Sequence, residues 1–167
     1  MPEAWLRGPI EGIAPVFQPV AHALVQARED VTRVAAGMPA AGLWADPGGG
    51  AAPAGFHLLH LANGLDRLLT YARGEMLSDG QQRALEAESE PPSDLDGAAL
   101  VAHVEAAIVR ALAQVRTTDP DRLLEPRRVG RAGLPSTVLG LLVHAAEHTT
   151  RHVGQFITTS KIVRARR

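Results

Sequence analysis

Four stretches of the sequence place apolar residues three and four positions apart, which is the spacing of one face of an α-helix. We expect helices from Pro15 and Pro19 to about Gly37, from Phe56 to about Arg73, from Ser93 or Asp94 to about Val115, and from Leu134–Thr137 to about Val163. No strand pair is predicted, because no region alternates apolar and polar residues convincingly. The pattern therefore predicts an all-α protein, a four-helix bundle.

The connections between these helices differ in length. Gly42 to Gly55 is rich in glycine and proline and is expected to be a loop, as is Asp121 to Gly133. The polar connection from Leu77 to Pro92 is longer and has room for a short helix from Gln81 to Glu88. That length permits a crossover between the second and third helices instead of a tight antiparallel turn.

Composition narrows the class of protein. A chain of 167 residues fits one domain spanning 1–167. Charge is nearly balanced, with 17 Lys and Arg against 18 Asp and Glu, so no nucleic-acid partner is predicted. No apolar run is long enough for a membrane span, and the N-terminus lacks a signal-peptide pattern, so we expect a cytoplasmic protein without a membrane partner. There is no cysteine, which leaves nitrogen and oxygen as the available metal ligands.

Three of the seven histidines stand at successive four-residue steps, at His144, His148 and His152. Residues four apart on a helix differ by about 40° around the axis and about 6 Å along it, so two such imidazoles can converge on one ion. On a helical wheel His152 borders the apolar face, His148 lies next, and His144 is furthest toward the polar side. His148 and His152 are therefore the predicted pair of metal ligands.

A third ligand has to come from another helix, because a metal site open to substrate generally uses three protein ligands. The second helix offers His57 and His60, and the wheel alone slightly favours His57. We expect structural roles for His22 and His103. Glu147 lies on the polar side of the fourth helix and is interpreted as a solvated charge.

Two motifs resemble the DinB / YfiT-like superfamily of metal-binding proteins. The first is "HLLHLANGLDRLLTYARGE" on the second helix. The second lies on the fourth helix and consists of His148, three intervening residues and then His152-Val-Gly-Gln155. The resemblance implies an up-down-down-up four-helix bundle with a long connection between helices 2 and 3, often homodimeric. It also implies a divalent metal ion, nickel or zinc, held by three histidines.

Carried onto this sequence, the resemblance assigns the metal to His60, His148 and His152, and so prefers His60 over the wheel's His57. Many relatives have a second histidine immediately before the one in "His-x-Gly-Gln", and here that place is Arg151, which would alter the mouth of the site. The remaining candidates, as residues that support the ligands or face the substrate, are His57, His144, Arg151 and Gln155.

The implied chemistry follows from the charge of the site. Three neutral imidazoles leave a bound divalent ion its full charge, which lowers the pKa of a thiol or water at an open position. The resemblance further implies a small-molecule substrate and a low-molecular-weight thiol such as bacillithiol or mycothiol, in an S-transferase reaction. Metal-assisted hydrolysis is the alternative enzyme class. A non-catalytic metal-binding stress protein, or a structural homodimer, is the alternative outside enzymes.

Overall fold

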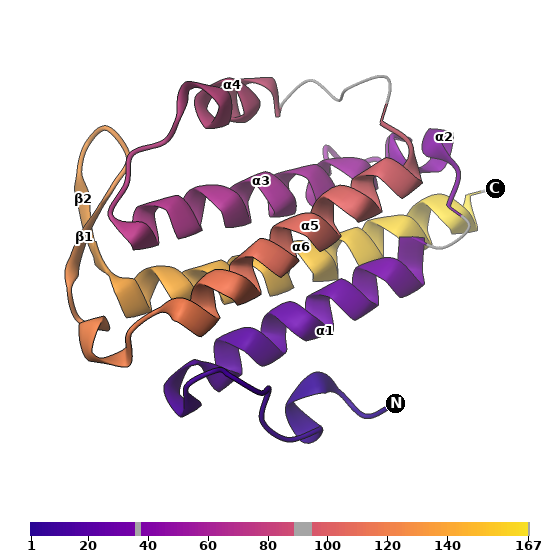
Figure 1. The fold of residues 1–167 in the computed structure, drawn as a ribbon. Helices are drawn as coiled ribbons and strands as arrows, with labels where there is room; N and C mark the ends of the chain where they lie inside the picture. The colour runs from indigo at the N-terminus through magenta and orange to yellow at the C-terminus, as the bar shows by residue number, and fades with distance from the viewer. Residues whose placement is uncertain (36–37, 89–94, 167) are drawn as a thin grey trace.

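A computed structural model describes residues 1–35, 38–88 and 95–166. Four long helices form the body of the molecule: α1 (Gln18–Ala35), α3 (Ala54–Arg73), α5 (Gly97–Thr117) and α6 (Val138–Ala165). Followed by colour in Figure 1, α3 and α5 run in the direction opposite to α1 and α6. The predicted four-helix bundle with up-down-down-up order is confirmed.

The core lies between the four helices. α1 and α3 each pack against both α5 and α6, so the four helices surround one apolar centre. Each of them contributes large side chains without solvent contact, among them Leu24, Leu58, Leu65, Leu100, Ile108, Leu142 and Phe156. Burying a side chain of this size stabilises the fold by about 1.5–3 kcal/mol. α3 and α6, which pack against each other, carry five of the seven histidines.

Helix ends agree with the predictions to within a few residues. α3 ends at Arg73 and is capped by Gly74, whose φ of 84° lies in the left-handed region that favours glycine. α5 begins at Gly97, where the Asp96 carboxylate accepts a hydrogen bond of 2.8 Å from the Ala99 amide. The cap is therefore Asp96, whereas the predicted caps Ser93 and Asp94, like the predicted end of the first helix at Gly37, lie outside the described residues.

The expectation of no strand pair was wrong. β1 (Pro126–Val129) pairs antiparallel with β2 (Leu134–Thr137), Pro126 opposite Thr137, within the region predicted as a loop and the opening of the fourth helix. The connecting turn uses Gly130 and Gly133 at positive φ. Thr137 ends the strand and caps α6, since its hydroxyl accepts a hydrogen bond of 3.0 Å from the Gly140 amide.

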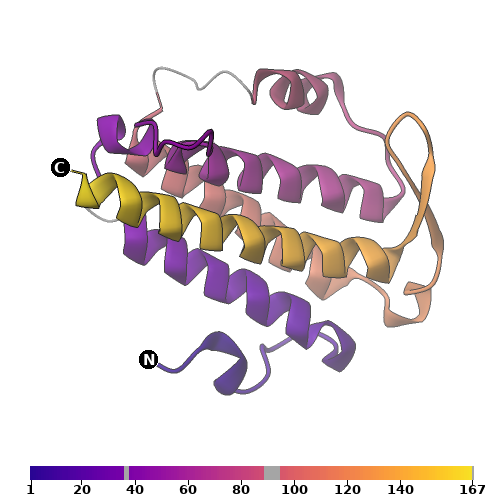
Figure 2. The same cartoon turned by 180° about the vertical axis from the view of Figure 1, so that it is seen from behind.

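Short helices fill the connections. They are η1 (Ala4–Leu6), η2 (Pro15–Phe17), α2 (Ala40–Leu43), α4 (Asp79–Ala87) and η3 (Pro120–Arg122). The predicted helix over Gln81–Glu88 is confirmed as α4, which begins two residues before the predicted start and ends one residue before the predicted end. Ser78 and Gln81 form a capping box at its N-terminus. Figures 1 and 2 both show α4 lying across the outer side of α3. Glu88, the residue that follows α4, contacts His60 of α3.

α5 is long and apolar enough to cross a membrane by length and composition alone. Core helices of bundles satisfy the same two criteria. In this fold α5 directs Leu100, Val104 and Ile108 into the core against the neighbouring helices.

Candidate metal centre

Histidines from α3 and α6 meet at the interface of these two helices. His60, His148 and His152 each offer a ring nitrogen within 4.8 Å of the others, and we call them the three-histidine group. Their ring centroids lie 4.5 to 5.0 Å apart, and all three side chains are partly buried. The structure therefore brings together the set implied by the resemblance, with His60 and not His57 as the contribution of α3.

The spacing within the group suits a metal ion. The Nε2 atoms of His60 and His148 lie 3.1 Å apart. Two nitrogens bound to one ion at about 2.0–2.1 Å in tetrahedral geometry lie about 3.3 Å apart. A small adjustment of the two rings would therefore let both nitrogens bind one cation.

Glu88, at the C-terminal end of α4, orients His60. Its Oε2 lies 2.6 Å from Nδ1 of His60, and Arg67 donates hydrogen bonds to both oxygens of the same carboxylate. Because a carboxylate accepts, His60 carries its proton on Nδ1 and keeps the Nε2 lone pair for an ion. Burial opposes ionisation of Glu88, but the hydrogen bonds from His60 and Arg67 hold the pKa of the carboxyl below its usual value.

His57 supports His152 and is not a member of the group. It is 6% exposed, and its Nδ1 lies 3.3 Å from Nδ1 of His152. With Nδ1 of His152 engaged in this way, Nε2 is the nitrogen left to bind an ion. Burial, with a smaller effect of a charge on His60, lowers the pKa of His57.

The two α6 members of the group are held in the neutral form that a metal requires. Burial, reinforced by the charge that His60 would carry, lowers the pKa of His148 to about 4. Burial and the neighbouring His148 lower the pKa of His152 to about 3. Nδ1 of His148 is buried and has no hydrogen-bond partner among the described residues. At neutral pH the rings of His148 and His152 are therefore uncharged, and each has a nitrogen lone pair available to bind an ion. The three imidazoles thus fit a divalent cation.

The other predicted site residues lie at the rim. His144 is exposed, with its ring centroid 5.8 Å from that of His148. Arg151 donates to Glu147 at 2.9 Å from Nε, which agrees with the interpretation of Glu147 as a surface charge. Gln155 is exposed, and its side chain makes no hydrogen bond to another described residue.

The two histidines expected to be structural have partners outside the group. Nε2 of His22 lies 2.9 Å from the Gly8 carbonyl oxygen, and Nε2 of His103 lies 2.9 Å from Oδ1 of Asn63. Both contacts connect separate segments of the chain.

Sequence reasoning did not find Glu88. It lies in a polar connection, 28 residues from His60, and no periodicity relates the two positions. The Ser78–Gln81 pair does predict the start of a helix there. Whether Glu86 within that helix or Glu88 at its end would reach a histidine depends on how α4 packs against α3.

Comparison with known proteins assigns the family. The sequence matches the profile of the DinB superfamily over residues 23–156. The chain belongs to the DinB superfamily. All four histidines at the α3–α6 interface fall inside the matched range. A crystal structure of a conserved protein from Enterococcus faecalis has the same fold, with a TM-score of 0.73 and 17% identity, covering 91% of this chain and 99% of that one. No curated protein sequence matches the chain.

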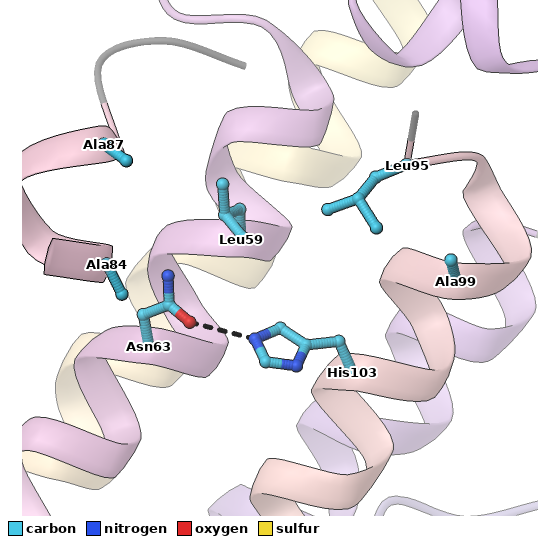
Figure 3. A pocket seen from close by; sticks show the side chains of 7 residues that line it. All are labelled: Leu59, Asn63, Ala84, Ala87, Leu95, Ala99 and His103. Atoms are coloured by element: carbon cyan, nitrogen blue, oxygen red, sulfur yellow. Dashed lines mark hydrogen bonds between the residues drawn. The ribbon is translucent and has the colours of Figure 1, made fainter. Parts of the chain in front are cut away.

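This DinB-superfamily chain also has a largely apolar cavity of about 580 Å³ between α3, α4 and α5. Figure 3 shows its walls, with Asn63 and His103 hydrogen-bonded at one side. Two lining residues, Leu59 and Ala87, directly precede His60 and Glu88 in the sequence. The same two helices therefore supply both the cavity wall and the His60–Glu88 pair.

Proposed function

We propose that this protein is a metal-dependent enzyme that binds nickel or zinc through His60, His148 and His152 and activates a low-molecular-weight thiol. The observation that carries the proposal is the 3.1 Å approach of the His60 and His148 Nε2 atoms beside the ring of His152. A bound divalent ion supplies positive charge that lowers the pKa of a thiol at its open position. The expected homodimer and cytoplasmic location belong to the same proposal.

The surrounding residues support the orientation of the ligands. Glu88 fixes the tautomer of His60, and His57 engages the outer nitrogen of His152. Phe56 stacks on the His60 ring, with centroids 5.4 Å apart and planes 12° from parallel. Rings held on several sides lose little further freedom when an ion binds, so the site needs little reorganisation.

The reaction class is the one that the family resemblance implies, and the absence of cysteine in the chain fits it. Because the chain has no cysteine thiol, a thiol nucleophile has to arrive as a substrate. In the proposed transfer, sulfur forms a bond to an electrophilic carbon, and the leaving group departs with its bonding electrons. The thiol proton passes to the leaving group or to solvent. The apolar cavity lined by Leu59, the residue before His60, has the size and character of a site for the organic part of a small substrate.

Metal analysis of alanine variants tests the site. We expect the purified protein, reloaded with Zn²⁺ or Ni²⁺, to bind one ion per chain, and H148A and H152A each to lose stoichiometric binding because two imidazoles hold an ion weakly. H103A is the matched control, since its nitrogen bonds Asn63. Equal loss in all three variants would contradict the assignment.

A thiol-consumption assay tests the activity. The metal-loaded protein is mixed with a small thiol and an alkylating electrophile, and loss of free thiol is followed with and without the metal. We expect metal-dependent consumption that H148A abolishes. Metal-dependent hydrolysis of an ester without thiol consumption would instead support water activation. Metal binding without either reaction would support the non-catalytic alternative.

A further inference from the structure

A glycine of α3 lies against one ring of the three-histidine group. Gly64 lies one helical turn after His60 and is buried in the middle of α3. A Cβ atom at this position would lie 2.8 Å from Cε1 of His148, 3.4 Å from its Nδ1 and 3.6 Å from its Nε2. The imidazole of His148 therefore rests directly against the backbone of α3.

Glycine in a helix interior costs about 1 kcal/mol relative to alanine, so its use here calls for a compensating reason. The three nearest heavy atoms to the missing side chain all belong to one ring. By contrast Gly154, on α6, has no atom within 4 Å of such a Cβ. The volume that a side chain at position 64 would fill is thus occupied by the ring of His148.

The distance by which an added Cβ would displace the His148 ring indicates why position 64 has no side chain. Ordinary contact with a Cβ begins at 3.4 Å, so an alanine at 64 would move the ring by about 0.6 Å, the difference between 3.4 and 2.8 Å. Metal–nitrogen distances tolerate only about 0.2 Å. The contacted atom Cε1 is bonded to both ring nitrogens, so a shift of this size carries Nε2 away from its position opposite His60.

We infer that Gly64 is a positioning residue of the metal centre, which sets the place of the His148 imidazole by leaving room for it. This inference rests on the proposed metal site. Glu88 holds His60 and His57 engages His152 through polar contacts. His148 has no such partner at Nδ1 among the described residues, and the backbone at Gly64 is the surface against which it rests.

The test compares Gly64→Ala with Gly154→Ala, the same exchange at two helical positions. Affinity for Zn²⁺ and Ni²⁺ is measured by competition with a chelating dye. We expect G154A to bind as the wild type does and G64A to bind at least about tenfold more weakly, in the range found when a residue that orients a ligand is altered. Equal affinity of G64A and wild type would overturn the inference. If wild type and G154A themselves bind neither ion, the proposed function fails.

Thermal unfolding of the metal-free proteins separates positioning from general packing. Alanine raises helix propensity at both sites, so G154A should melt above the wild type, whereas the contact with His148 should cancel the gain in G64A. In the H148A background the space is empty, and adding G64A should raise the melting temperature. A change of the same size and sign in both backgrounds would show that His148 is not what alanine displaces, and would overturn the inference.

Discussion

At the scale of single residues, the proposed metal centre depends on groups that hold the outer nitrogens of its histidines. Glu88 is the most engaged of these, since one buried carboxylate bonds both His60 and Arg67. A carboxylate in this place makes the imidazole a better ligand and fixes its tautomer. Arg67 in turn keeps that carboxylate ionised in a buried environment.

Glu88→Gln should lower metal affinity by about 10- to 100-fold without abolishing binding. The amide oxygen still accepts from Nδ1 of His60 but lacks the charge that strengthens the bond. The measurement is again dye competition with Zn²⁺. Glu86→Gln, at an exposed carboxylate of the same helix, is the control and should bind as the wild type does. Unchanged affinity of E88Q would show that the contact is structural only.

At the scale of elements, α4 differs from the four helices of the bundle because none of its residues is buried. Polar contacts hold it on α3: Gln81 donates to Asp66 at 2.6 Å and to Thr70 at 2.8 Å, and Glu88 bonds His60 just beyond its last turn. A helix held in this way is expected to open locally far more often than the core helices.

Hydrogen exchange should therefore show amides of α4 exchanging much faster than those in the middle of α3. Because metal binding favours the His60 tautomer that donates to Glu88, adding Zn²⁺ should slow exchange in α4 of the wild type. In E88Q the slowing should be smaller. Exchange in α4 as slow as in α3 before metal is added would contradict this description of the helix.

At the scale of the whole molecule, buried neutral histidines couple folding to pH. The folded protein lowers the pKa of His148 to about 4 and that of His152 to about 3 from the ordinary imidazole value of 6.5. Below about pH 6.5 these two histidines bind protons in the unfolded chain but stay neutral in the folded chain, which favours unfolding. The contribution of these groups to stability is thus present above that pH and is lost as pH falls toward the folded values.

Urea unfolding of the metal-free protein should show a free energy of unfolding that declines from pH 7 to pH 4.5. The double variant H148A/H152A removes two of the groups responsible and should show a shallower decline over the same range. The carboxylates and His57 are present in both proteins, so the difference between the two curves reports the contribution of His148 and His152. Parallel curves for the two proteins would contradict the link.

Sequence periodicity predicted the four helices because amphipathic spacing is a local property of the chain. It also predicted that His148 and His152 share one face, since a four-residue step has the same geometry in any helix. The β1–β2 hairpin was not predicted. Leu134–Thr137 carries both strand and helix-capping residues, and pairing with Pro126–Val129 decides which state the residues before Thr137 adopt.

The sequence by itself determined the helices and, with its two family motifs, the identity of the three-histidine group. Only the tertiary structure decided that Glu88 reaches His60, that His57 faces His152, and that Gly64 gives His148 its place. The physical reason is that helix formation depends on residues within one or two turns. Contacts across the α3–α6 and α3–α4 interfaces depend instead on how whole helices rotate and slide against each other, and no local pattern records this.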